Sequence, residues 1–158
     1  LSTNANPNGY TVIAKGGVNI DTGVVNTTPL KAPSGSKAIN PITTLVQVLV
    51  ESGDASDVSD ASAKVVSALG LTPGTNLTDF DPISEIATGG DVNALNAQKA
   101  AVQIVTIVAL ASADTDTAVA ASNANSILSN IASEIVAAAN DGVTLDLSDV
   151  GVVSNSVR

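Results

Sequence analysis

The clearest hydrophobic pattern in the chain lies between residues 40 and 53. Its apolar positions recur at spacings of three and four residues, which places them on one face of an α-helix. These positions are Ile42, Leu45, Val46, Leu49 and Val50. Asn40 is a preferred N-cap residue, Pro41 fits the first helical position, and Gly53 suits the end. The pattern therefore predicts a helix that begins after Asn40 and stops at Gly53.

A second helix is predicted from Asp57 to Leu69, followed by Gly70 in the left-handed position and a turn at 72–74. Its inward positions are Ala61, Val65, Ala68 and Leu69. Asp81-Pro82 repeats the cap-then-proline pattern and predicts a short helix that Gly89-Gly90 closes.

Asp91 is expected to cap the longest helical stretch. Residues 100–111 are apolar on nearly every side, apart from Gln103 and Thr106, which is typical of a central helix surrounded by others. This run is shorter than the roughly 20 residues that span a bilayer, so no membrane span is expected. The polar residues 1–8 are not expected to act as a signal peptide, and the chain is expected to begin after its export signal or inside a longer protein.

Another helix is predicted after a turn that contains Asp114 and Asp116, and Asn140-Asp141-Gly142 ends it. Its heptad-like seam is Ala118, Ala121, Asn125, Leu128, Ala132, Ile135 and Ala139. We expect this seam to pack antiparallel on the central helix, with Asn125 either as a register-setting polar residue between helices or as a binding group. Ser148-Asp149 could cap a last helix over 150–157, whereas residues 143–147 alternate as a strand does.

Residues 1–38 form a different region, because glycines and prolines interrupt any helical period. Residues 10–14 and 18–20 flank Lys15-Gly16-Gly17 and predict a short hairpin, and residues 30–32 are a candidate third strand. The predicted fold is mainly α, a bundle of five or six helices with a short N-terminal β arm or hairpin. We divide the chain into the arm, 1–38, and the helical bundle, 39–158, within a single structural domain.

Composition narrows the chemistry. The 158 residues include one Phe, one Tyr and no Trp or Met, so small aliphatic side chains must form the core. The net charge of -9 argues against binding to nucleic acid or anionic lipid. The chain has no Cys and no His, which removes thiolate and imidazole chemistry and ordinary transition-metal sites. A chain rich in Thr, Ser, Asn, Asp and Gly, with few Lys and no Cys or Met, suits an oxidising exterior, so we expect an extracellular or cell-surface location.

Acidic clusters are the best candidates for a site, because calcium takes six to eight oxygen ligands. The clusters are Asp79 with Asp81, Asp114 with Asp116, and Asp54 with Asp57 and Asp60. We name Asp79, Asp81, Asp114 and Asp116 as candidate calcium ligands. The alternative is that Asp57, Asp81, Asp91 and Asp114 cap helices or meet the helix dipole.

Other residue types point away from catalysis. The glutamates Glu51, Glu85 and Glu134 show no alignment as an acid and base pair, and no motif supports a Ser-Lys dyad with Lys64 or Lys99. Gly16-Gly17 and Gly89-Gly90 lack the Lys-Ser/Thr of a phosphate loop and are expected to be turns. Tyr10 and Phe80 are either core anchors, which we favour, or exposed binding contacts.

The order of short motifs resembles a helical module of large secreted bacterial surface proteins, which often carry hemolysin-type calcium-binding repeats. After the glycine-containing arm the motifs are Ala32-Pro33-Ser34-Gly35, Asn40-Pro41-Ile42-Thr43-Thr44-Leu45-Val46, Ala68-Leu69-Gly70-Leu71, Asp79-Phe80-Asp81-Pro82-Ile83, Gly90-Asp91 and Gln98-Lys99-Ala100-Ala101. The resemblance covers about residues 16–150 and implies export and attachment to a larger adhesin-like chain. It implies no catalytic residue, and the calcium-binding repeats themselves are absent from this sequence.

The sequence therefore predicts a non-catalytic, cofactor-free structural, adhesion or assembly module of a larger secreted surface protein. Its expected partners are neighbouring domains of the parent protein or another surface protein, with self-association as a further possibility. The alternative is a module that binds a small ligand or calcium and serves a secreted enzyme or adhesin.

Overall fold

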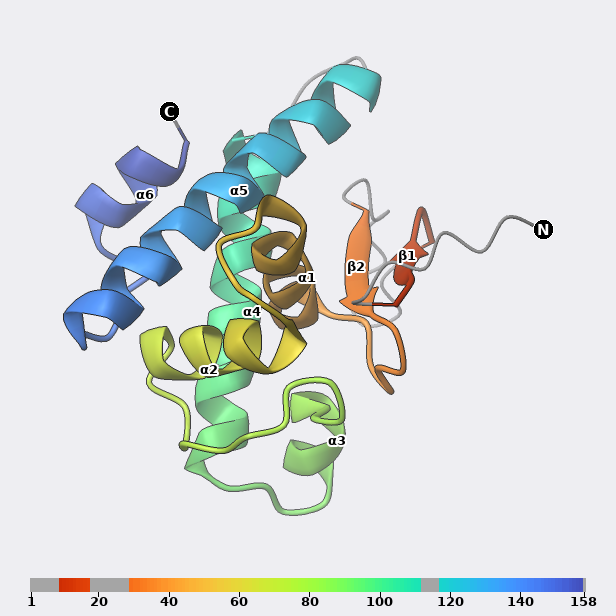
Figure 1. Cartoon of the computed structure of the whole chain (residues 1–158), viewed down its shortest axis with the longest axis vertical. Helices are drawn as coiled ribbons and strands as arrows, with labels where there is room; N and C mark the ends of the chain where they lie inside the picture. Colours follow the sequence, from red (N-terminus) through yellow and green to blue (C-terminus); the bar gives the residue numbers. More distant parts are fainter. Residues whose placement is uncertain (1–8, 18–28, 112–116, 158) are drawn as a thin grey trace.

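The computed structural model describes residues 9–17, 29–111 and 117–157. Within these ranges the chain forms two strands and six helices (Figure 1), which confirms the predicted mainly α fold with a short β arm. The elements are β1 (Thr11–Ala14), β2 (Leu30–Pro33), α1 (Pro41–Ser52), α2 (Val58–Ala68), α3 (Pro82–Ala87), α4 (Val92–Ala111), α5 (Thr117–Asp141) and α6 (Val150–Ser156).

The helices begin where the cap residues predict. The Asn40 side chain accepts a hydrogen bond from the Thr43 backbone N–H at 2.9 Å, and the Thr43 hydroxyl accepts one from the Asn40 N–H, so the two form a capping box. The carboxylates of Asp57, Asp81 and Asp149 accept first-turn N–H groups of α2, α3 and α6 in the same way. These contacts satisfy donors that have no partner inside their own helix.

The centre of the bundle is α1, whereas the sequence pattern had predicted residues 100–111 for that place. Every residue from 42 to 49 is buried, and α1 contacts β2, α2, α4 and α5. Helix α4 leaves Val102, Val105 and Leu110 exposed to solvent. A helix that is apolar all round is the expected signature of a core position, but here one side of that helix has no described neighbour.

Helix α5 is the longest helix, with 25 residues against 20 in α4, and its buried face differs from the predicted seam. The buried side chains are Ala124, Ile127, Leu128, Ile131, Ala132, Ile135 and Ala138. Ala118 and Asn125 are exposed, so Asn125 does not set a register between helices. Because Ala residues occur all round α5, the spacing permits several faces, and packing on α1, α2 and α4 selects one of them.

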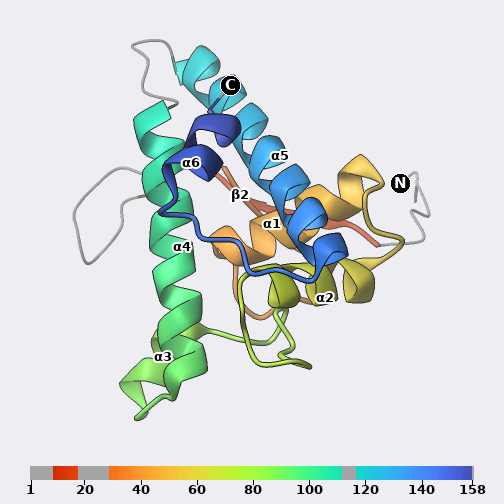
Figure 2. The same ribbon diagram turned by 90° about the vertical axis from the view of Figure 1, so that its left-hand side faces the viewer.

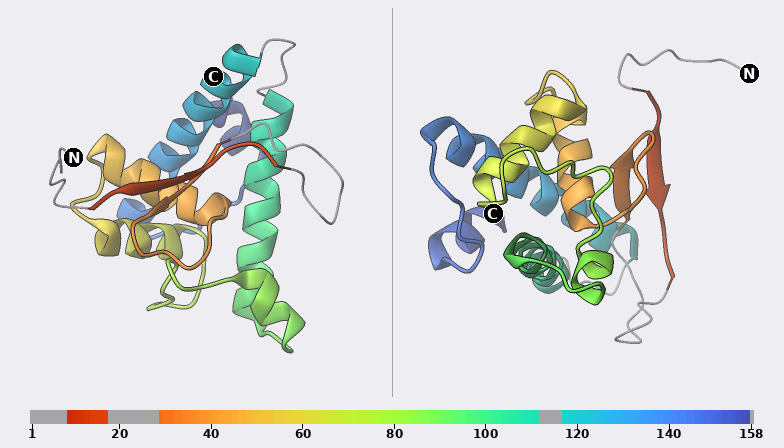
Figure 3. Two further views of the ribbon diagram at one scale, coloured as in Figure 1. Left: turned by 90° about the vertical axis from the view of Figure 1, so that its right-hand side faces the viewer. Right: turned by 90° about the horizontal axis from the view of Figure 1, so that it is seen from below.

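The β arm lies against α1, with β2 between β1 and the helix (Figure 3). The two strands pair antiparallel, with Val12 opposite Ala32 and Ile13 opposite Lys31. The candidate third strand is therefore the partner of the first, and the predicted strand at 18–20 lies outside the described residues. Tyr10 is 70 % exposed, so its prediction as a core anchor is wrong, while Phe80 is partly buried against the core.

The C-terminal ambiguity resolves in favour of a helix. Residues 143–147 form no strand, although the Leu145 N–H donates to the Ala68 carbonyl at 2.7 Å and Leu147 is buried. Gly142, with a φ of 67°, ends α5 as predicted, since the left-handed region favours glycine. Helix α6 then packs on α5.

Candidate functional site

The outer side of α4 carries more exposed large hydrophobic side chains than any other element among the described residues. We call it the α4 face and define it by Val92, Leu95, Val102, Val105 and Leu110, all of which are exposed. At about 100° per residue these positions fall on one side of the helix, and the buried Ala94, Ala97, Ala101, Ile104 and Val108 fall on the other. Figure 2 shows α4 along one edge of the bundle, with α1, α2, α5 and α6 on its inner side.

The α4 face carries almost no charge. Across its 20 residues α4 has no Asp or Glu and a single charged residue, Lys99, although the whole chain has a net charge of -9. Clustered apolar side chains with few charges are typical of the centre of a protein contact surface rather than of ordinary solvated surface.

A groove of about 480 Å³ adjoins the α4 face between α4 and the segment that contains α6. Its lining is almost entirely apolar and includes Val102, Ile107 and Leu110 from α4 and Leu147 and Val153 from the C-terminal segment. The Thr106 hydroxyl also lies there, but it donates to the Val102 carbonyl at 2.8 Å within its own helix. The groove therefore favours hydrophobic contact over directional polar recognition.

A second hollow, of about 740 Å³, lies between α2 and the turn at 71–78. It is lined by hydroxyl, amide and apolar side chains, including Ser59, Ser62 and Asn76, and none of its lining residues is ionisable. It offers hydrogen bonds but no acid, base or nucleophile activated by a charged neighbour.

Helix α4 is also long and apolar enough to cross a membrane by length and composition, with a mean hydropathy of 1.4 over its most apolar window. This is weak evidence, because a core helix of a soluble protein passes the same test. The predicted absence of a membrane span stays a prediction.

The described candidate calcium ligands, Asp79 and Asp81, make different contacts. The Asp81 carboxylate accepts the N–H groups of Ile83 at 3.1 Å and Ser84 at 3.4 Å, as a cap does, and Asp79 pairs with Lys37 at 3.3 Å. Asp114 and Asp116 lie outside the described residues. In the part of the chain that is described, no three acidic side chains gather to hold an ion. The calcium site stays a prediction.

The alternative reading of the acidic residues as caps is confirmed for three of them. Asp57 and Asp81 cap α2 and α3, and the Asp91 carboxylate accepts the Ala94 N–H at 3.1 Å at the start of α4. Glu51, Glu85 and Glu134 lie on three different helices, α1, α3 and α5.

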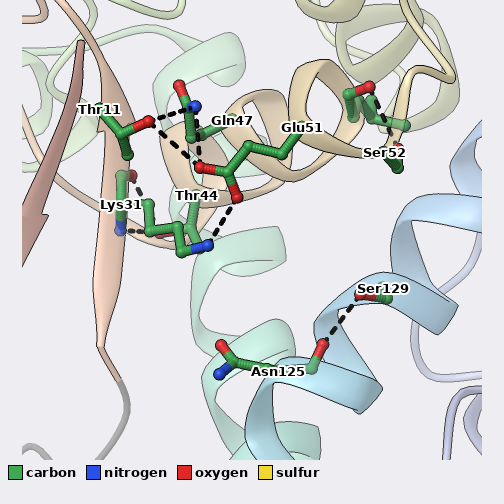
Figure 4. A network of polar contacts seen from close by, with 9 residues as sticks. Thr11, Lys31, Thr44, Gln47, Glu51, Ser52, Asn125 and Ser129 are labelled. Carbon is green, nitrogen blue, oxygen red and sulfur yellow. Dashed lines mark hydrogen bonds and ion pairs between the residues drawn. The ribbon is translucent and has the colours of Figure 1, made fainter. Parts of the chain in front are cut away.

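A polar network that the hydrophobic pattern did not reveal joins the β arm to α1 (Figure 4). The Glu51 carboxylate accepts hydrogen bonds from Lys31 Nζ at 2.6 Å and from Gln47 Nε2 at 3.0 Å. Gln47 Nε2 also donates to the Thr11 hydroxyl at 2.7 Å, and the Lys31 N–H donates to the Thr44 hydroxyl at 2.9 Å. The available sequence signal for this network was the pair of polar residues Gln47 and Glu51, which lie four residues apart on a largely apolar helix. Because these hydrogen bonds join Thr11 of β1 and Lys31 of β2 to α1, the network anchors both strands on the helix.

The network determines the protonation of Glu51. Partial burial is the largest single influence and raises the pKa of Glu51, but hydrogen bonds from Lys31, Gln47 and Thr11, with the Lys31 charge, together outweigh it. The pKa of Glu51 therefore lies below its ordinary value. A depressed folded-state pKa stabilises the fold above the unfolded-state pKa, and this stabilisation is lost as the pH falls through the folded-state pKa.

We expect Glu51→Gln to lower the free energy of unfolding at neutral pH but not in strong acid. The loss at about pH 7 should stay below about 1 kcal/mol, because the Glu51 side chain is 38 % exposed and solvent weakens the ion pair. Urea unfolding of both proteins from neutral pH down to about pH 3 measures the difference. In a Lys31→Gln background the same substitution should cost less. An equal cost at every pH would contradict the ion-pair explanation.

The fold places this chain among mainly α proteins, here with a two-stranded β arm packed on the central helix. No protein-family model, no curated protein and no solved structure matches the chain. Its resemblance to helical modules of secreted surface proteins therefore stays a prediction that rests on the motifs of the sequence.

Proposed function

We propose that this chain is a non-catalytic structural, adhesion or assembly module of a larger secreted bacterial surface protein, and that it makes contact through the α4 face. The observation that carries the proposal is the gathering of Val92, Leu95, Val102, Val105 and Leu110 on one exposed side of a helix. Such a surface is costly to leave in water and gains free energy when a partner covers it.

The chemistry of the chain supports a contact function rather than a reaction. The sequence contains no His and no Cys, so the imidazole base and the thiolate nucleophile that many enzymes use are missing. In its main polar network the charged groups Lys31 and Glu51 pair with each other, and the network joins structural elements. The α4 face is apolar, which suits packing against another protein.

The proposed location outside the cell rests on composition and on the motif resemblance. A chain with neither Cys nor Met has no sulfur side chain to oxidise, which suits an oxidising exterior. The partners under this proposal are neighbouring domains of the parent protein, another surface protein or a second copy.

We expect Val102→Glu to weaken retention of the parent protein at the cell surface of the source organism. A charge in the middle of the α4 face must be desolvated on contact, and this opposes binding. Val143→Glu is the matched control, because Val143 is 54 % exposed and Val102 is 55 % exposed, and Val143 lies in the segment after α5, away from α4. Immunoblots of surface and medium fractions should show release of the first variant alone. Equal retention of both variants, with unchanged melting temperatures, would contradict a contact role for the α4 face.

The groove beside α6 supports a second candidate function, the binding of a small apolar molecule. Its volume of about 480 Å³ lies within the usual range for ligand pockets, about 300–1,000 Å³. Under this alternative a saturating long-chain alcohol should raise the melting temperature, because selective binding to the folded state stabilises it. Leu147→Glu, in the groove lining, should abolish the rise, and an unchanged melting temperature of the wild-type protein would remove the candidate.

A further inference from the structure

We propose that the α4 face binds the same face of a second copy of this chain, with the two α4 helices antiparallel about a two-fold axis beside Val102 and Val105. This inference rests on the contact surface of the proposed function and names its partner. A two-fold axis needs a surface that complements itself, and an apolar face with Lys99 as the single charged residue of its helix has this property when the pairing keeps the two Lys99 side chains apart.

The low charge of the α4 face indicates what kind of partner can cover it. A basic partner would need acidic groups on the contact surface, and α4 has none; an acidic partner would find only Lys99. The matching surface must therefore be apolar and nearly uncharged, and the α4 face of another copy meets that requirement. In a chain of net charge -9, α4 has no acidic residue of its own to repel a second copy.

The spacing along α4 suits a helix-to-helix contact. Leu95, Val102 and Ala109 recur every seven residues, as core positions of paired helices do, and all three are exposed. An antiparallel pair brings Leu95 of one copy toward Ala109 of the other, so that large and small side chains meet. A parallel pair would place the two Lys99 ammonium groups at one level. The antiparallel pair separates them by about 9–14 Å along the axis, at about 1.5 Å per residue.

The size of the surface indicates a moderately weak dimer. From Val92 to Leu110 the α4 face is about 27 Å long at about 1.5 Å per residue, and a helix with side chains is about 10–12 Å wide. The groove beside α6 widens the surface on one side. The total reaches several hundred Å² per partner, below the roughly 800 Å² of a standard stable interface. We therefore expect a dimer that forms with rising protein concentration.

Light scattering after size-exclusion chromatography tests the association. The wild-type chain should shift from 15.5 kDa toward twice that mass between about 1 µM and about 1 mM. Leu95→Glu and Val102→Glu should each remain monomeric over this range, while Val143→Glu should behave as wild type. Circular dichroism checks that each variant keeps its helices, and two separate variants guard against misfolding of one. A wild-type chain that stays monomeric throughout would overturn the proposal, as would dimerisation that neither Glu variant affects.

Cross-linking tests the orientation, because the sequence contains no Cys and each introduced thiol is unique. A mixture of Leu95→Cys and Ala109→Cys chains should form a mixed dimer with a short bis-maleimide reagent. Leu95→Cys alone should cross-link poorly, since antiparallel pairing separates its two copies by more than about 20 Å. If two Leu95→Cys chains cross-link efficiently with each other and no mixed dimer of Leu95→Cys with Ala109→Cys forms, the helices pair in parallel and the proposed arrangement is wrong.

Surface attachment through the α4 face and self-association through the same face can be distinguished by experiment. A monomeric chain whose Val102→Glu variant is still released from the cell surface would overturn the self-association and leave the contact role of the α4 face in place. A dimer that Val102→Glu dissociates without any change in surface retention would support the self-association and overturn the attachment role. If uncharged phosphatidylcholine vesicles bind the monomer and no dimer forms, the occupant of the α4 face is lipid and the proposal is wrong.

Discussion

Leu45→Ala is expected to lower the free energy of unfolding by about 3–5 kcal/mol, a large share of the stability of an ordinary domain. Leu45 is fully buried in α1, which contacts β2, α2, α4 and α5. Truncation would leave a cavity where several elements meet, and a packed neighbourhood of this kind relaxes only partly. Urea unfolding followed by circular dichroism gives the free-energy difference.

Ile83→Ala provides the control for that loss. Ile83 is 58 % exposed on α3, so its truncation should change the free energy of unfolding by no more than about 0.5 kcal/mol. Equal losses for Ile83→Ala and Leu45→Ala would contradict the central position of α1.

Ala97→Leu is expected to cost about 1–3 kcal/mol, although it adds an apolar side chain to a helix. Ala97 is fully buried on the inner side of α4, within the main core, where the close approach of helices depends on small side chains. Leu and Ala both favour helix, so intrinsic propensity changes little, and the cost arises from overpacking. Thermal unfolding at a single low protein concentration measures it without interference from self-association.

An exposed alanine of the same helix supplies the matched control. Ala109 faces solvent on α4, so the larger side chain of Ala109→Leu has room and should leave the melting temperature nearly unchanged. Both variants are compared at the same low protein concentration, where pairing of copies does not contribute. If Ala97→Leu stabilised the chain, the helices would be less tightly packed than the burial of their alanines indicates.

These expectations share one physical basis, a core assembled from Ala, Val, Ile and Leu with little help from aromatic rings. Phe80 contributes only from a partly buried position, and Tyr10 is exposed. The alanine side chain is small, so exposing it to water costs little free energy compared with burying it. The alanines of a helix therefore do little to determine which of its faces is buried. This property makes the chain unusually dependent on its larger aliphatic side chains for specificity.

The starts and ends of the helices were predictable because the contacts that determine them are local. Asn40 contacts Thr43, Asp81 contacts Ile83 and Ser84, and the left-handed Gly142 ends α5, all within a few residues along the chain. Such contacts depend on the short-range conformation of the backbone and the chemistry of one or two side chains. The residue types near each cap therefore suffice to predict where a helix begins or ends.

The polar network and the candidate contact surface were not predictable in this way. Lys31 and Glu51 are 20 residues apart, and Thr11 and Gln47 are 36 apart, so their contacts exist only once β1 and β2 lie on α1. Likewise, α4 carries apolar residues on both sides, and the sequence pattern alone does not distinguish the side that other helices cover from the side that faces solvent.

The sequence by itself determined the mainly α class, the helix caps, the small aliphatic character of the core and the missing His and Cys chemistry. Only the tertiary structure decided that α1 is central, that Asn125 faces outward and that the α4 face is exposed. The reason is that caps and periodicity are properties of a short segment, whereas the burial of one helix face depends on how the other elements pack around it.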